Sequence, residues 1–302
     1  AWPKVTVDLE DDGLGFDYKW NMGWMNDFIE YMKNDPVFRG AHHDQLTFSM
    51  IYAYSEKFLL SISHDEVVHM KGSLYTKMPG EDQQKLANLR LAYGYQLAHP
   101  GKKLLFMGQE FGQIREWSEQ RSLDWELLEE DGHRKLQEYM QALLKLYHSC
   151  PALYEYDFSS DGFEWINCLE WEKNLLIFLR KTKKREDTLL IVCNFSNVVY
   201  DNFMIGVPYP GKYKEIFNSD AAAFGGEGVV NPRVKMSKKA ECDERKNSIT
   251  VKIPALGMSV FSYSRPAEKA KDNKTAKTHQ KKTSVKRNLK KELEEKFETE
   301  EK

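Results

Sequence analysis

Acidic, imidazole, amide and aromatic side chains gather in three short stretches of the N-terminal half, at residues 16–24, 63–69 and 107–113. Aromatic faces stack on pyranose rings, and carboxylates, imidazoles and amides hydrogen-bond hydroxyl groups. This combination predicts a pocket for a sugar. The side chains expected to bind the sugar are Tyr18, Trp20, Trp24, His64, Asp65, Glu66, Gln109 and Glu110.

The run from His64 to His69 also contains potential metal ligands. Its order, His-Asp-Glu-Val-Val-His, differs from the helical H-E-x-x-H pair of zinc proteases, so we expect no metal. Taken alone, the run is equally consistent with structural polar residues at the end of a strand. Asp65 and Glu110 could also form an acid/base pair, because glycoside chemistry needs two carboxylates across the scissile bond, but the sequence does not define their separation.

The aromatic residues admit two interpretations. Tyr18, Trp20 and Trp24 lie within seven residues and are interrupted by polar residues and glycine, which favours the wall of a cleft over a plain core. Trp117 and Trp125 belong to a long polar segment, which could shape a substrate groove or only pack on the following domain.

Short apolar runs precede these stretches and indicate the elements that position them. Residues 58–62 and 103–107 are continuous apolar runs typical of buried strands, and a third short run ends at Trp20. Helices are predicted at 82–99 and 133–153, the first ending at a Pro-Gly pair. Alternating strands and helices predict a parallel sheet, and in a βα barrel the functional residues follow the strands.

From residue 163 to 263 the pattern changes to strand-like runs separated by turns rich in proline and glycine. It predicts an antiparallel β-sandwich of about 100 residues. The expected strands are 175–179, 189–194, 202–207, 213–217, 248–253 and 259–263.

The C-terminal segment has a distinct composition. Residues 265–302 carry 13 Lys and Arg against 8 Asp and Glu, a net charge of +5, which leaves −7 on the rest of the chain. We therefore divide the chain into residues 1–155, 156–265 and a charged tail at 266–302, predicted to be disordered, with a transient helix at 288–302. An acidic body and a tail with charge blocks of alternating sign do not favour nucleic-acid binding.

Two further properties bear on location. No run of about 18 apolar residues is present, so we expect no transmembrane helix and no membrane partner. The four cysteines are widely spaced without a C-x-x-C pair, which favours reduced thiols and a cytoplasmic protein.

The three stretches resemble motifs of the branching enzymes of the α-amylase superfamily. Residues 63–74 with 77–80 resemble the motif at the seventh barrel strand, residues 15–25 the sixth, and residues 107–113 the eighth. The resemblance covers roughly residues 1–264. It implies an α/β plus all-β fold: the C-terminal part of a TIM (β/α)8 barrel, about strands six to eight, followed by the antiparallel β-sandwich.

The resemblance also implies roles. Asp65 corresponds to the carboxylate that stabilises the transition state, and His64 hydrogen-bonds the sugar beside it. The implied reaction, in glycogen biosynthesis, transfers an α-1,4-glucan segment to a glucose 6-hydroxyl and forms an α-1,6 branch by retaining glycosidase chemistry, without a cofactor. The expected partner is an α-1,4-glucan such as glycogen or amylose.

This sequence departs from the family pattern in one respect. The nucleophilic Asp and the acid/base Glu of the family have no match here, because Ala1-Trp2-Pro3 resembles the sequence just beyond that Glu. We expect the isolated chain to be an inactive, aggregation-prone fragment that needs the N-terminal part of its own barrel. A related α-glucan hydrolase and a non-catalytic glucan-binding remnant are the alternatives.

Overall fold

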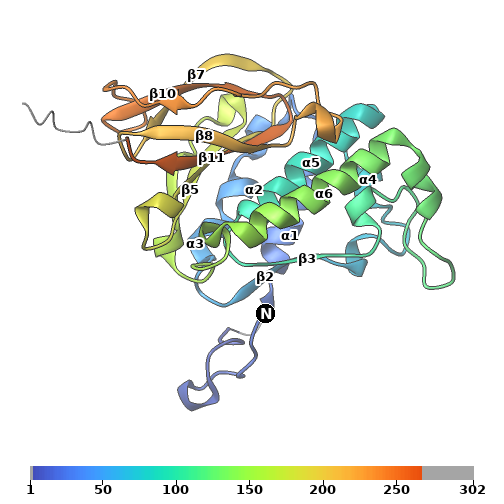
Figure 1. Cartoon of the computed structure of the whole chain (residues 1–302). Helices are drawn as coiled ribbons and strands as arrows, with labels where there is room; N and C mark the ends of the chain where they lie inside the picture. The colour runs from blue at the N-terminus through green and yellow to red at the C-terminus, as the bar shows by residue number, and fades with distance from the viewer. Residues whose placement is uncertain (1–2, 267–302) are drawn as a thin grey trace, which may run out of the picture. The chain divides into compact units, whose positions relative to one another are not determined.

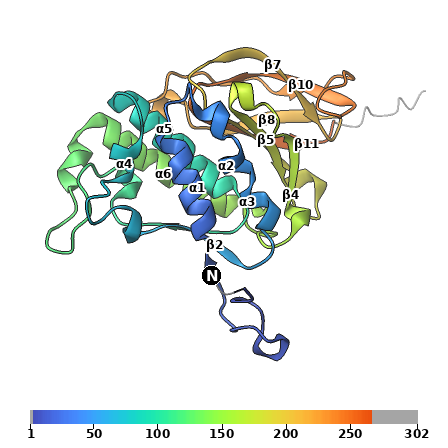
Figure 2. The ribbon, with the colours of Figure 1, turned by 180° about the vertical axis from the view of Figure 1, so that it is seen from behind.

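The structure is a computed structural model that describes residues 3–266 (Figures 1 and 2). The predicted tail, including the helix expected at 288–302, lies outside these residues apart from Pro266. The segment before the first strand extends away from the body in both views.

A small parallel sheet carries the sequence stretches described above. Its strands are β1 (Lys19–Trp20), β2 (Phe58–Ile62) and β3 (Lys102–Leu105), in that order. The strand predicted at 58–62 is confirmed, because a continuous apolar run is buried on both faces. The strand predicted at 103–107 begins one residue earlier and ends at Leu105. It ends there because the Gln109 side chain accepts a hydrogen bond from the N–H of Phe106 at 3.0 Å, so this N–H does not pair with a neighbouring strand.

Helices cover this sheet and connect its strands. The longer helices are α1 (Met22–Lys33), α5 (Asp82–Ala98) and α6 (Asp131–Ser149), and the one-turn helices are α2 (Asp44–Thr47), α3 (Ser49–Tyr52) and α4 (Leu74–Lys77). A capping box between Glu81 and Gln84 starts α5 as predicted. The second predicted helix stops four residues early, because Pro151 cannot continue it and a 3-10 turn follows.

The C-terminal region consists of antiparallel sheets. A six-stranded sheet has the order β4-β5-β6-β11-β8-β9, and β10 pairs with β7 in a two-stranded sheet. Apolar residues of both sheets form a common core, among them Ile177, Ile205 and Ile249. The strands are β4 (Phe163–Asn167), β5 (Leu175–Arg180), β6 (Leu189–Asn194), β7 (Tyr200–Val207), β8 (Lys212–Asn218), β9 (Lys235–Met236), β10 (Asn247–Ile253) and β11 (Gly257–Ser264). All six predicted strands are present, each within two residues of its predicted ends.

The helices and the six-stranded sheet share a second core. Its members come from α1, α5 and α6 and from β5, β6 and β11, for example Phe28, Tyr95 and Phe178. Helix α5 is buried along nearly its whole C-terminal half because it packs against both α6 and this sheet. Residues up to Arg265 therefore form one compact unit, and the boundary predicted at 155 stays a prediction.

Candidate functional site

A short 3-10 turn, His64–Glu66, follows β2 after Ser63. The Oγ of Ser63 accepts the N–H of Asp65 at 3.3 Å and thereby starts the turn. His64 Nε2 lies 3.1 Å from Asp65 Oδ1, and both side chains are 51% exposed. Glu66 is half-buried. The structure thus brings an imidazole and a carboxylate together at the open end of β2, with polar atoms accessible to a ligand.

A loop of unusual backbone geometry follows this turn. His69, Met70 and Gly72 have φ values of 57°, 68° and 72°, all in the left-handed region. The loop returns to the turn through Lys71, whose Nζ donates to the carbonyl oxygen of Asp65 at 2.6 Å. The backbone of Asp65 is therefore held by residues on both sides.

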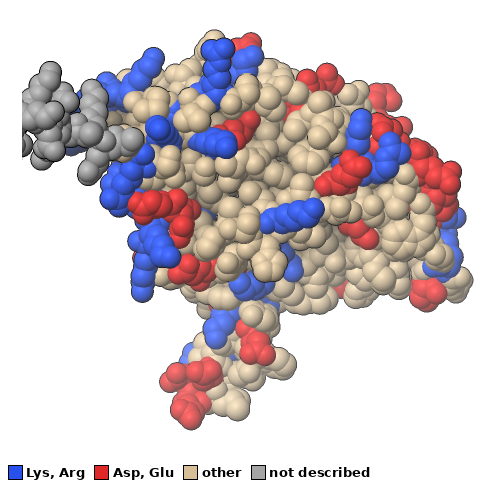
Figure 3. All heavy atoms as spheres, in the orientation of Figure 1, with Lys and Arg blue, Asp and Glu red and all other residues tan. Residues whose placement is uncertain are grey.

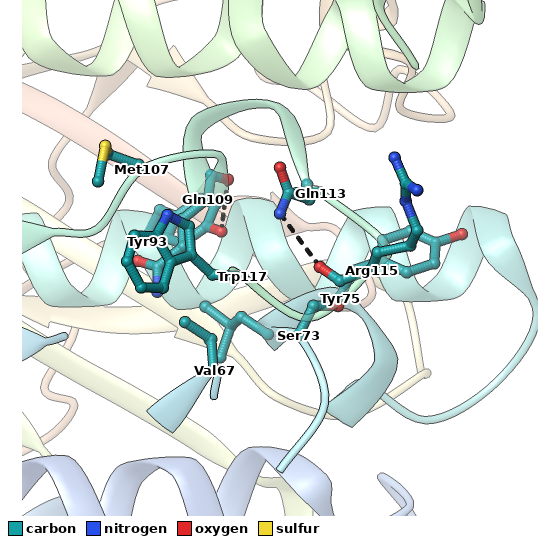
Figure 4. A pocket seen from close by; sticks show the side chains of 11 residues that line it. Val67, Ser73, Tyr75, Tyr93, Met107, Gln109, Gln113, Arg115 and Trp117 are labelled. Atoms are coloured by element: carbon teal, nitrogen blue, oxygen red, sulfur yellow. Dashed lines mark hydrogen bonds between the residues drawn. The ribbon is translucent and has the colours of Figure 1, made fainter. Parts of the chain in front are cut away.

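The residues after β3 are more enclosed than the sequence predicted. Gln109 is buried, and Tyr93 donates to its carbonyl oxygen at 2.7 Å. The Oε1 of Gln109 accepts a hydrogen bond from the N–H of Phe106. Its Nε2 is buried without a hydrogen-bond partner, beside a cavity of about 10 Å³ (Figure 4). That cavity has room for about one water molecule. Gln109 is thus placed to shape the end of β3, and Glu110 beside it is half-buried.

The three aromatic residues of β1 and α1 have different environments. Tyr18 and Trp20 are 48% and 41% exposed, but Tyr18 precedes β1 and lies at the amino end of the sheet, with its ring 6.0 Å from that of Phe158. Trp24 is only 1% exposed, and the expectation that it lines a cleft is corrected: it lies in the first turn of α1, stacked on Phe28 at 5.0 Å. The spacing of four residues to another aromatic side chain was the signal for a shared buried helix face.

An aromatic row connects the two strand ends and joins His64 to Phe106 and Trp117, two residues that were not among the predicted sugar contacts. The ring of Phe106 lies 6.0 Å from that of His64 and 5.1 Å from that of Trp117. Together with His69 and Arg121, His64 and Trp117 line a groove of about 430 Å³, within the size range of small-ligand sites. Only Trp117 had a sequence signal, its place in a long polar loop, because the packing of Phe106 on it is not local in sequence.

Both acidic and basic side chains line this groove, namely Glu116, Glu119 and Arg121. The backbone N–H groups of Gly72, Met70 and Lys71 lower the pKa of the Glu116 carboxyl, so that it stays ionised. On the face drawn in Figure 3, acidic and basic side chains are interspersed over the surface. Among residues 3–266 no three His, Cys, Asp or Glu side chains are placed to hold a metal ion together.

Comparison with known proteins connects this geometry to a family. Over 277 residues, 92% of this chain, the sequence is 49% identical to the 1,4-alpha-glucan branching enzyme GlgB of Geobacillus stearothermophilus. It is 50% identical over 263 residues to the enzyme of that name from Aquifex aeolicus. The chain is homologous to the GlgB branching enzymes. It spans 43% and 42% of the length of these two relatives.

Other similarities locate the β region and the fold. Residues 165–264 of this branching-enzyme homologue match the family described as alpha amylase, C-terminal all-beta domain. An alpha-amylase from H. orenii superimposes with a TM-score of 0.53 at 17% identity, covering 87% of this chain and 52% of that chain. A type I pullulanase from Bacillus subtilis, complexed with maltose, gives 0.58 at 15% identity, covering 81% of this chain and 35% of that chain. At such low sequence identities these two structures indicate a shared fold and nothing about function. In the part of the chain that is described, no helix is both long and apolar enough to cross a membrane.

Proposed function

We propose that this chain forms part of a glycogen branching enzyme, which cleaves an α-1,4-glucan and transfers the released segment to a glucose 6-hydroxyl as an α-1,6 branch. The observation that carries the proposal is the 49% identity to a GlgB enzyme over 92% of the chain. The parallel order β1-β2-β3 and its connecting helices fit strands six to eight of a (β/α)8 barrel, whose ligands bind at the carboxyl ends of the strands.

Asp65 is the residue proposed to stabilise the transition state. In retaining glycoside chemistry, positive charge develops on the sugar ring, and hydrogen bonds to its hydroxyls strengthen as the ring distorts. A half-exposed carboxylate on a short, capped turn can supply both effects without moving. His64, at 3.1 Å, orients that carboxylate and can bond a neighbouring hydroxyl.

Further side chains are proposed to contact the ligand, although the parallel register of Lys19 with Phe58 places Tyr18 at the amino end of the sheet, away from Asp65 at its carboxyl end. Tyr18 and Trp20 offer exposed aromatic faces for stacking on pyranose rings, and Glu66 and Glu110 offer partly exposed carboxylates for hydroxyls. Gln109 supports the site from its buried position. The four cysteines are free thiols, which supports a cytoplasmic location.

The test uses a hybrid enzyme of full GlgB length, in which this chain replaces the matching segment of the Geobacillus stearothermophilus enzyme. Incubated with amylose, the hybrid should form α-1,6 linkages, detected as new side chains after digestion with a debranching enzyme. Release of free sugar without new branches would instead support a hydrolase. Binding of amylose without any reaction would support a glucan-binding module.

A further inference from the structure

Glu116 lies in the loop after β3 and reaches across to the loop after β2. Its Oε1 accepts the N–H of Gly72 at 2.9 Å, and the backbone N–H groups of Met70 and Lys71 also lower the pKa of its carboxyl. Three successive N–H groups that converge on one anion form a nest, a backbone cradle that favours negative charge. The carboxylate that fills this nest belongs to the chain itself.

The nest conformation has to be maintained by its anion. His69 and Met70 are not glycines, yet both adopt positive φ, which is sterically unfavourable for residues with a side chain. The Met70 side chain is 97% exposed and gains no packing in return. The hydrogen bond from Gly72 to Glu116 therefore helps to hold this stretch of backbone in place, together with hydrogen bonds from Lys77 Nζ to the carbonyl oxygens of Lys71 and Gly72.

The same backbone stretch is connected to the Asp65 turn. Lys71 Nζ donates to the Asp65 carbonyl oxygen at 2.6 Å, and Lys77 Nζ donates to the Gly72 carbonyl oxygen at 3.1 Å. On the other side of Glu116, the N–H of Trp117 donates to the carbonyl oxygen of Val67 at 3.0 Å. Glu116 thus links the two loops that flank the groove, and both links end within two residues of Asp65.

We propose that Glu116 is a positioning residue, which holds the 69–72 backbone in place and, through the hydrogen bond from Lys71 to the Asp65 carbonyl oxygen, fixes the position of the Asp65 backbone beside the groove. The proposal rests on the function proposed above for Asp65. Because a misplacement of about 1 Å can cost on the order of 100-fold in rate, the loss of this anion should lower kcat while leaving ground-state glucan binding nearly intact.

The experiment compares Glu116→Ala, Glu116→Gln and the control Glu129→Ala in the hybrid enzyme. Glu129 is exposed, carries the same charge and lies outside the groove. We expect kcat for branching to fall by about 10- to 100-fold in E116A and less in E116Q, with KM changed by less than about 3-fold. Amide hydrogen exchange at residues 70–72 should accelerate by at least about 10-fold in E116A, and E129A should match the unsubstituted enzyme in both readouts.

Anion rescue separates this role from a general loss of structure. Added formate should occupy the empty nest of E116A, slow exchange at 70–72 and restore part of kcat, whereas chloride at the same ionic strength should do less. Unchanged kcat and exchange in E116A would overturn the proposal, and so would formate without effect. If the unsubstituted hybrid forms no branches, the function proposed above is wrong. The exchange and formate measurements then still test whether Glu116 holds the 69–72 backbone in place.

Discussion

The turn that carries Asp65 has an accessible carboxylate, and the loop that follows it has a conformationally costly backbone. His69 and Met70 both have positive φ, and the loop closes on Asp65 through Lys71. At functional sites such strain persists only where the surrounding contacts fix the conformation. Here the contacts include the hydrogen bond from the Gly72 N–H to Glu116 and the one from Lys77 Nζ to the Gly72 carbonyl oxygen, which makes the local geometry sensitive to single substitutions.

Replacement of Met70 by glycine tests the strain directly. Glycine removes a steric cost of about 1–2 kcal/mol at this φ. Its greater conformational freedom in the unfolded chain lowers the stability by about 0.4–1 kcal/mol and so offsets part of this gain. Since the Met70 side chain is almost fully exposed, M70G should stabilise the protein by about 0.5–1 kcal/mol in chemical denaturation. In the control Leu144→Gly, an exposed position in the interior of α6, stability should fall by about 1 kcal/mol. Lower stability of M70G would show that the loop is not strained.

Single-residue environments were predictable only in part. The rule that functional residues follow parallel strands located His64 and Asp65 correctly at an exposed strand end. The same rule did not separate Trp20 from Trp24, because a helix begins between them and turns Trp24 into the core. The contact of Phe106 with Trp117 joins residues eleven positions apart and needs the folded loop.

At the scale of elements, the N-terminal segment is tied to the parallel sheet by one carboxylate. Glu56, just before β2, accepts the N–H of Val5 at 2.9 Å, the N–H of Thr6 at 2.8 Å and the hydroxyl of Thr6 at 2.7 Å. It also pairs with Lys19 at the start of β1. Burial raises its pKa, but the hydrogen bonds from Thr6, Val5 and Lys19 outweigh this and bring the pKa to about 2.

This depressed pKa predicts a pH dependence. A carboxyl group with a folded-state pKa below its unfolded value stabilises the fold above that value, and the contribution is lost as pH falls. The advantage of the unsubstituted protein over Glu56→Gln should be about 1–3 kcal/mol at neutral pH and should shrink as pH falls from about 4.5 towards 2. Denaturation at several pH values measures it, with the exposed Glu30→Gln as control. A difference that does not change with pH would contradict the assignment.

Elements themselves were largely predictable because their apolar patterns are continuous. The strands β2 and β6 match their predicted ranges, since each is buried along its length. Strand β4 was not predicted because Glu164 and Asn167 interrupt its apolar pattern, and only pairing with β5 defines it. Strand β9 has two residues and no pattern to detect.

At the scale of the whole molecule, a buried ion pair joins the helices to the β-sheet. Arg180, in β5, is completely buried and pairs with Asp157 at 2.8 Å. Its guanidinium also donates to the carbonyl oxygens of Ala98 at 2.6 Å and Leu153 at 3.2 Å. One side chain therefore satisfies the ends of two helical segments. This junction could not be predicted from the sequence, because its partners are up to 82 residues apart.

Removal of this charge should destabilise the whole unit. Arg180→Ala leaves Asp157 and the carbonyl oxygens of Ala98, Leu153 and Gly162 with fewer partners, which costs about 3–5 kcal/mol. Lys181→Ala, next to it, removes only a partly exposed pair with Glu164 and should cost less than about 1 kcal/mol. Chemical denaturation followed by fluorescence measures both. Equal losses would show that Arg180 does not hold the two layers together.

The central claim is that Asp65 stabilises the transition state of branching. The measurement is the initial rate of α-1,6 bond formation by the full-length hybrid, with Asp65→Asn compared with Asp161→Asn, an exposed carboxylate remote from the groove. We predict that D65N lowers kcat by at least about 100-fold, with a native-like unfolding transition, while D161N keeps full activity. A D65N hybrid that branches amylose within a few-fold of the unsubstituted rate would contradict the account.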